Sequence, residues 1–74
     1  MSGRVDEKMQ VEINGEQKTI PDGLDVEGML GHLGLDARMV VVERNRDILR
    51  REQLGDVAVA AGDRFELVHF VGGG

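Results

Sequence analysis

The sequence predicts an α+β domain in which a mixed sheet curls around one main helix. Three observations carry this prediction: an alternating segment that turns back on itself at Asn14-Gly15, one apolar stripe with helical spacing, and three strand-like segments after that stripe. Seventy-four residues allow a single domain with a small core. We expect residues 1–7 to form a flexible lead, 8–71 the folded domain and 72–74 a flexible tail.

The first two strands are expected to form a hairpin. Residues 9–13 (M-Q-V-E-I) alternate apolar and polar side chains, which is typical of a half-buried strand. Asn14-Gly15 predicts a two-residue type I′ turn, because both central positions of that turn need positive φ. Residues 16–20 return as the partner strand, and Pro21-Asp22-Gly23 predicts a loop.

The single helix is expected to begin after Asp25, whose carboxylate can accept hydrogen bonds from the free amides of the first turn. Its apolar stripe follows the i, i+3, i+4, i+7 spacing and consists of Val26, Met29, Leu30 and Leu33. Gly34 predicts a left-handed C-terminal end, and Leu35 can close the hydrophobic contact of a Schellman ending. His32 lies off the stripe, so we expect it to face solvent.

Three more strands are expected after the helix. Residues 39–43 (M-V-V-V-E) are nearly all apolar, as in a strand covered along most of its length. Residues 44–47 predict a polar turn into a short strand at 48–49, and residues 52–55 a single helical turn or loop. With a last strand from residue 64, the order is β-β-α-β-β-β. That order is typical of the β-grasp, the ubiquitin-like fold.

The last strand, residues 64–71, is rich in the β-branched and aromatic types that strands favour. Alternation along it predicts that Phe65 and Leu67 face the core. The other face carries apolar residues too, and exposed apolar residues in a cluster indicate a partner surface. The predicted partner-binding residues are Val68, Phe70 and Val71.

The composition excludes most kinds of catalysis. The chain has no cysteine, hence no disulfide framework, zinc–thiolate site or cysteine nucleophile, which fits a reducing cytosol. Ser2 is the only serine and Thr19 the only threonine, so a Ser-His-Asp arrangement is implausible. His32 and His69 are too few for a metal site, and we expect His69 to be packed or hydrogen-bonded. We therefore predict no metal site and no enzyme.

Charge and hydropathy exclude two classes of partner. The formal net charge of −5 argues against binding to nucleic-acid phosphates. The longest apolar run is too short to span a bilayer, and the first eight residues lack the apolar region of a signal peptide. Four arginines, however, come from adjoining segments and could form a basic patch that attracts an acidic partner: Arg44, Arg46, Arg50 and Arg51. The alternative is an ordinary mixed surface.

Three glycines, Gly72, Gly73 and Gly74, follow the last strand directly. Glycine is entropically costly to order, so three in succession make a poor structural ending. A thread without Cβ atoms can instead enter a narrow tunnel and present its carboxylate to another protein's active site. The alternative is a merely disordered terminus.

Three segments together resemble the ThiS family of ubiquitin-like sulfur carriers. They are V-V-V-E-R-N at 40–45, A-G-D at 61–63 and F-E-L-V-H-F-V-G-G-G at 65–74, and the resemblance covers residues 8–74. It implies a carrier that binds no cofactor itself. A ThiF-type, ubiquitin-activating-like adenylyltransferase would use ATP and magnesium to adenylate the carboxylate of Gly74.

The resemblance also implies the later steps. A sulfur donor system would convert the adenylate into a thiocarboxylate, and thiazole synthase would take that sulfur for the thiazole ring of thiamine. The free carrier is expected to be a cytoplasmic monomer. Sibling carriers for molybdopterin, cysteine synthesis or tRNA thiolation share the activation chemistry and remain open. So do a ubiquitin-like protein modifier and an interaction module with an inert tail.

Overall fold

The computed structural model describes residues 7–70. Its elements, in chain order, are β1 (Lys8–Ile13), β2 (Glu16–Pro21), α1 (Val26–His32), the 3₁₀ helix η1 (Ala37–Met39), β3 (Val40–Arg44), β4 (Asp47–Leu49), the 3₁₀ helix η2 (Arg51–Asp56) and β5 (Arg64–His69). The predicted order of helix and strands is confirmed. Residues 1–6 and 71–74, which hold most of the predicted lead and all of the predicted tail, lie outside the described residues.

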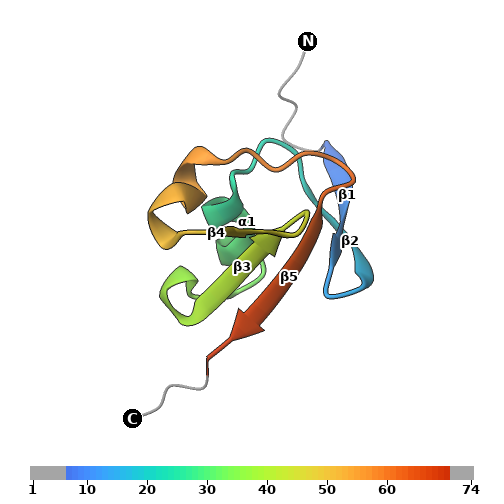
Figure 1. Cartoon of the computed structure of the whole chain (residues 1–74). Helices are drawn as coiled ribbons and strands as arrows, with labels where there is room; N and C mark the ends of the chain where they lie inside the picture. The colour runs from blue at the N-terminus through green and yellow to red at the C-terminus, as the bar shows by residue number, and fades with distance from the viewer. Residues whose placement is uncertain (1–6, 71–74) are drawn as a thin grey trace.

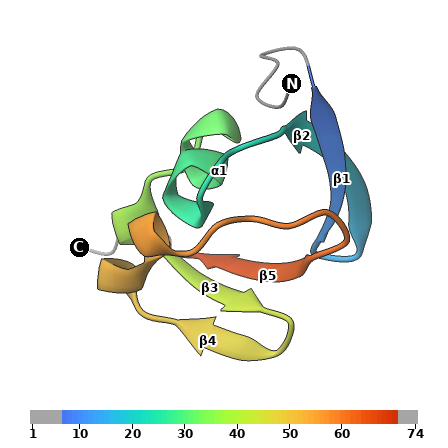
Figure 2. The same cartoon turned by 90° about the horizontal axis from the view of Figure 1, so that it is seen from above.

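The five strands form one mixed sheet in the order β2-β1-β5-β3-β4. β1 and β5, the first and last strands, are parallel neighbours, and the other neighbouring pairs are antiparallel. Helix α1 lies against one face of the sheet, and the hairpin of β1 and β2 curls up beside it (Figure 1, Figure 2). The fold is the β-grasp that the sequence predicts.

Both hairpins of the sheet close through two residues with positive φ. Asn14 (φ 52°) and Gly15 (φ 83°) join β1 to β2, as the sequence predicts for a type I′ turn. Asn45 (φ 49°) and Arg46 (φ 76°) join β3 to β4 in the same way. The second turn was predicted only as polar, since Arg46 occupies a position where glycine is usual.

Helix α1 begins and ends as predicted. The Asp25 carboxylate accepts a hydrogen bond from the Gly28 N–H at 2.6 Å, which satisfies one free amide of the first turn. At the other end, the Leu35 N–H donates to the Leu30 carbonyl at 2.9 Å and the Gly34 N–H to the Gly31 carbonyl at 3.0 Å. Gly34 has φ 78°, so this is a Schellman ending.

The core lies between α1 and the inner face of the sheet. It is formed by Val11, Ile13, Ile20, Val26, Met29, Leu30, Val40, Val42, Leu54, Val59 and Phe65. Phe65 is only 1% exposed, and full burial of such a side chain contributes about 2 to 3 kcal/mol. Leu67 is half-buried against the same cluster, so the predicted inner face of the last strand is confirmed.

Small differences from the sequence prediction occur at element boundaries. Met39 belongs to η1, so β3 begins one residue later than predicted. Pro21 extends β2, which is an edge strand and therefore tolerates a residue without an N–H. The predicted helical turn at 52–55 is the centre of η2.

Candidate functional site: the C-terminal exit and the outer face of the sheet

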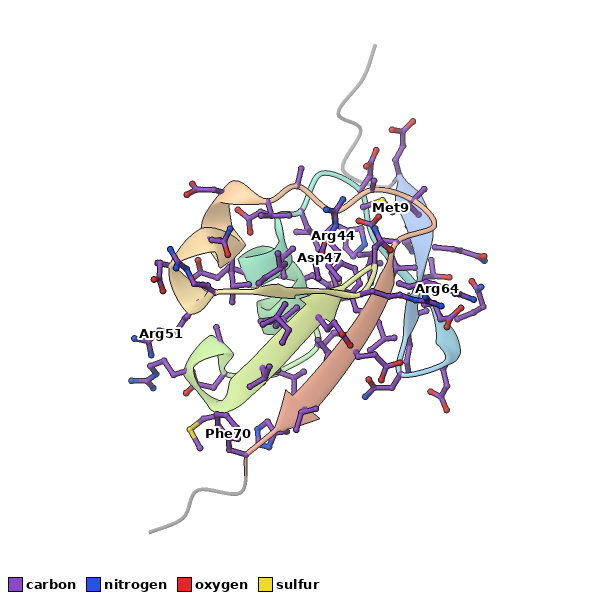
Figure 3. All side chains as sticks on the ribbon, viewed as in Figure 1. Met9, Arg44, Asp47, Arg51, Arg64 and Phe70 are labelled. Carbon is purple, nitrogen blue, oxygen red and sulfur yellow. The ribbon has the colours of Figure 1, made fainter. Side chains whose placement is uncertain are left out.

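The last described residues lead the chain away from the sheet at one end. β5 ends at His69, and the Phe70 N–H still donates to the Met39 carbonyl at 2.8 Å. Phe70 lies at the end of β5 from which the chain continues toward its C-terminus (Figure 3). The predicted site residues Val71, Gly72, Gly73 and Gly74 lie outside the described residues. The described structure therefore places Phe70, which we call the root of the tail, and not the tail itself.

An apolar patch covers the outer face of the sheet next to this exit. Val68 is 59% exposed and Phe70 47%, so the predicted outward face of the last strand is confirmed. Val41 (37% exposed) lies directly opposite Val68 in the pairing of β3 with β5, and Ile48 (68% exposed) is on β4. We call Val41, Ile48, Val68 and Phe70 the apolar patch. They are all the large hydrophobic side chains that are exposed among residues 7–70.

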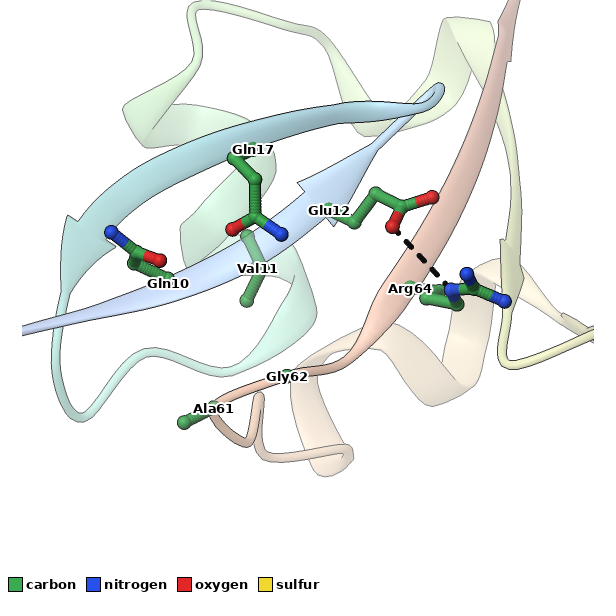
Figure 4. Close-up of a pocket in the computed structure, with 7 residues that line it drawn as sticks. All are labelled: Gln10, Val11, Glu12, Gln17, Ala61, Gly62 and Arg64. Carbon is green, nitrogen blue, oxygen red and sulfur yellow. Dashed lines mark ion pairs between the residues drawn. The ribbon is translucent and has the colours of Figure 1, made fainter.

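The other half of the outer face is polar. Gln17, Glu12 and Arg64 are register neighbours across β2, β1 and β5, and the Arg64 Nε lies 3.4 Å from a Glu12 carboxylate oxygen. With Gln10 and Gly62 they border an open hollow of about 320 Å³ (Figure 4). The outward side chains along β5 therefore change toward the exit, from the charged Arg64 and Glu66 to the apolar Val68, and Phe70 follows just after the strand.

A buried carboxylate, which the sequence prediction missed, organises the far end of β5. Asp63 accepts hydrogen bonds from Arg44 Nε (2.9 Å), from Asn45 Nδ2 (3.2 Å) and from the Ala60 N–H (2.9 Å). Asn45 in turn accepts from the Arg64 N–H at 2.9 Å. No local pattern in one sequence relates residues 18 or 19 positions apart. These hydrogen bonds give both segments a physical role: Arg44 and Asn45 supply the donors, and Asp63 of the A-G-D turn supplies the acceptor.

These contacts also set the ionisation of Asp63. Burial by itself would raise its pKa, but the hydrogen bonds from Ala60, Arg44 and Asn45 favour the charged form, and the net effect is a lowered pKa. The carboxylate is therefore an anion at neutral pH. Within residues 7–70, no three His, Asp or Glu side chains come close enough together to hold a metal ion.

The sequence profile of the ThiS family matches residues 9–74, which is most of the chain and includes its final glycines. The chain belongs to the ThiS family.

Relatives of this ThiS-family chain include both separate carriers and longer proteins. It is 35% identical over 65 residues to the sulfur carrier protein ThiS of Bacillus subtilis, covering 86% of this chain and 98% of that one. It is 46% identical over 66 residues to a thiazole synthase of Paramagnetospirillum magneticum, covering 89% of this chain. In that second match the chain spans only 20% of the relative's length.

A solved structure agrees with the fold of this ThiS-family chain. The crystal structure of the thiamine biosynthesis protein ThiS from Geobacter metallireducens has a TM-score of 0.74 and 37% sequence identity. That match covers 89% of this chain and all of the other. Among the residues described here, no helix has the length and apolar character needed to cross a membrane.

The four arginines of the predicted basic patch in this ThiS-family chain do not form a single cluster. Arg44 is engaged with Asp63 near the closed end of the β3–β4 hairpin, whereas Arg51 lies beyond the opposite end of β4 (Figure 3). Arg50 pairs with Glu52 at 3.7 Å. Because the three residues of β4 separate Arg46 from Arg50, the four charges are spread along a strand rather than gathered.

Two charged residues lie near the exit. The carboxylate of Asp36 accepts hydrogen bonds from Arg38 Nε (3.1 Å), NH2 (2.9 Å) and backbone N–H (2.9 Å). The Arg38 side-chain bonds, followed by the backbone bond, lower the pKa of Asp36 to about 2. His69 is exposed and its side chain makes no hydrogen bond within residues 7–70, so the prediction that it is packed or hydrogen-bonded is wrong. The reason is that His69 is the last residue of β5 and lies beyond the core cluster that covers Phe65 and Leu67 on the same face.

Proposed function

We propose that this chain is a sulfur carrier of thiamine biosynthesis that holds sulfur as a thiocarboxylate on Gly74. The observation that carries the proposal is the ThiS-family match through residue 74, which takes in β5 and the glycines that follow it in the sequence. A likeness to the ThiS proteins of Bacillus subtilis and Geobacter metallireducens supports the thiamine pathway.

Carboxylate chemistry requires an outside activator. An α-carboxylate has a pKa of roughly 3.3 to 3.7, so at neutral pH it is an anion and a poor electrophile. A ThiF-type adenylyltransferase would use ATP and magnesium to convert the carboxylate into an acyl-adenylate, releasing pyrophosphate. A sulfur nucleophile from the donor system would then displace AMP and leave the thiocarboxylate. The carrier supplies the reacting atoms and the partners supply catalysis.

Docking of these partners is assigned to the apolar patch. Four residues follow Phe70, and an extended chain spans at most about 3.6 Å per residue. An active site that reaches Gly74 must therefore approach within roughly 14 Å of Phe70. Such an approach brings the partner beside the outer face next to the exit, where Val41 and Val68 are exposed. Apolar area of this kind is suited to burial against a protein partner.

Thiazole synthase is the proposed recipient of the sulfur. The relatives from Paramagnetospirillum magneticum and Magnetococcus marinus are named thiazole synthase, and each contains a stretch of 66 residues similar to this chain. Carrier-like and synthase sequences joined in one polypeptide support a physical partnership between the two. We place the carrier in the cytoplasm with these enzymes, as a monomer when free.

Intact mass of the protein purified from its own cells tests this function against its alternatives. A mass increased by the difference between sulfur and oxygen, which rises by one further alkyl group when the thiocarboxylate is alkylated, is the expected result for a carrier. A ladder of larger adducts through Gly74 would instead indicate a protein modifier. A single unmodified mass, unchanged after incubation with the adenylyltransferase, ATP and sulfide, would indicate an interaction module. Loss of thiamine prototrophy on gene deletion separates the thiamine pathway from its siblings.

A further inference from the structure

The two edges of β5 are supported unequally. On one side β3 pairs with it from Arg44–Phe65 to Val40–His69, and the Met39 carbonyl extends this support to Phe70. On the other side β1 pairs with it only at Glu12–Arg64 and Ile13–Phe65. β1 then leaves the sheet through the turn at Asn14, while β5 continues toward the exit.

The side chain of Asn14 takes the place of the missing strand. Its Oδ1 accepts a hydrogen bond from the Leu67 N–H at 2.8 Å, and its Nδ2 donates to the Leu67 carbonyl at 3.3 Å. The Asn14 N–H donates to the Phe65 carbonyl at 2.9 Å. An amide side chain offers the same donor and acceptor as a peptide group. Asn14 therefore holds β5 two residues beyond the last β1 pair.

The turn alone does not require asparagine. Its positive φ of 52° would be satisfied equally by glycine, and aspartate also tolerates this conformation. Among these three residues, only asparagine both donates to the Leu67 carbonyl and accepts from the Leu67 N–H at neutral pH. The identity of residue 14 is thus explained by the contact with β5, made across 53 positions of sequence.

We propose that Asn14 is a positioning residue for the C-terminal tail. It fixes Leu67 against the first hairpin, and so holds Val68 and Phe70, the root of the tail, in the arrangement that an activating enzyme binds. The proposal rests on the sulfur-carrier function. Without this clamp the end of β5 is held by β3 alone and is less well ordered in the free carrier, and docking must first restore its order.

The free energy needed to order the end of β5 weakens binding and leaves the chemical step unchanged, because the docked complexes of wild type and variant are the same once formed. We expect Asn14→Gly to raise the KM of the carrier in ATP–pyrophosphate exchange by roughly five-fold, the effect of about one hydrogen bond, with kcat unchanged. Asn14→Asp keeps the acceptor for the Leu67 N–H and should recover part of the loss. Gln17→Ala, exposed in the same hairpin, is the matched control.

Amide hydrogen exchange provides the readout that is independent of the enzyme. In Asn14→Gly the Leu67 amide should exchange faster at a temperature well below the Tm, and the Phe65 amide should not. A KM within two-fold of wild type for Asn14→Gly would overturn the positioning role, as would an unchanged Leu67 exchange rate. If the wild-type protein itself supported no ATP–pyrophosphate exchange by the adenylyltransferase, the proposed function would fail. The hydrogen-exchange rate of the Leu67 amide would still decide whether the clamp exists.

Discussion

Arg44 and Asp63 form an ion pair that joins β3 to the turn before β5, with 2.9 Å between the Arg44 Nε and an Asp63 oxygen. The Asp63 side chain is only 8% exposed and Arg44 30%, so the pair is largely shielded from water. Asn45 and Ala60 donate to the same carboxylate. A buried charge that is satisfied on all sides is costly to remove, because each donor loses its partner.

The first prediction concerns this carboxylate. Asp63→Ala should lower the free energy of unfolding by about 3 kcal/mol, because it leaves Arg44 and two other donors without an acceptor. Folding lowers the Asp63 pKa, so ionised Asp63 stabilises the folded protein. The wild type should lose this pH-linked stabilisation as the pH falls from the unfolded-state pKa, about 3.9, through the lower folded-state pKa. Urea unfolding of wild type and Asp63→Asn from pH 7 to pH 2 measures it. Parallel curves for the two proteins over this range would refute the assignment.

A second prediction concerns the tail. Deletion of Gly74, or Gly73→Leu, should abolish adenylation, because the reacting carboxylate is moved or a side chain is placed in a tunnel sized for backbone. The Tm should stay unchanged, since both residues follow the last strand. Gly31→Ala is the control, because a Cβ at that position meets nothing within 4 Å. Adenylation of the truncated protein at the wild-type rate would eliminate the tail hypothesis.

The apolar patch gives a third prediction. Val68→Ala and Ile48→Ala should each weaken binding to the adenylyltransferase by about 1 to 2 kcal/mol at roughly 25 cal/mol per Å² of lost apolar area. Their exposure in the free carrier means that the Tm should change little. Thr19→Ala on the exposed edge strand β2 serves as the control. Isothermal titration calorimetry with the enzyme decides the matter, and unchanged affinity together with a lowered Tm would contradict the surface assignment.

Two helix glycines give a matched pair for the fourth prediction. Gly31→Ala should raise the free energy of unfolding by about 0.5 to 1 kcal/mol, because alanine loses less backbone entropy in a helix and has room here. At Gly28 a Cβ would lie 3.2 Å from the Asp25 carboxylate that caps the helix, so the same substitution should gain less or destabilise. Equal Tm increases in the two variants would show that the cap tolerates the extra methyl group.

The fifth prediction concerns Arg46, whose φ of 76° is a left-handed conformation that a long side chain adopts only with strain. Arg46→Gly should raise stability by roughly 0.5 to 1 kcal/mol, the relief of strain exceeding the extra entropy of the unfolded chain. Arg51→Gly, at the start of η2, should instead lower the Tm. Thermal unfolding of both variants gives the comparison. A less stable Arg46→Gly protein would mean that the arginine side chain makes a contact worth more than the strain.

Much of the fold is predictable because its signals are local. The Asn14-Gly15 turn, the Asp25 cap, the Gly34 ending and the alternation around Phe65 each depend on neighbouring residues, and each is confirmed. The outward position of Val68 follows from the same alternation.

The remaining features depend on contacts between distant segments. Asp63 is read locally as a turn residue, and only the fold brings Arg44 and Asn45 to it. The exposure of His69 depends on how far along β5 the core extends, which is set by residues distant in the sequence. Ile48 joins the apolar patch because the β3–β4 hairpin places it on the outer face, and no spacing within its three-residue strand indicates that.

The central place of β5 has a consequence for how the protein is made. β5 comes last in the sequence among the described strands, yet it lies between β1 and β3 and bonds to both. Until residues 64–69 have left the ribosome, the nascent chain holds two hairpins with no strand to connect them. Pairing across so long a sequence separation is a slow, late step of folding. The five-stranded sheet is therefore completed only once β5 is present, so a chain without residues 64–69 lacks both the Val68 part of the apolar patch and the strand that leads to the exit.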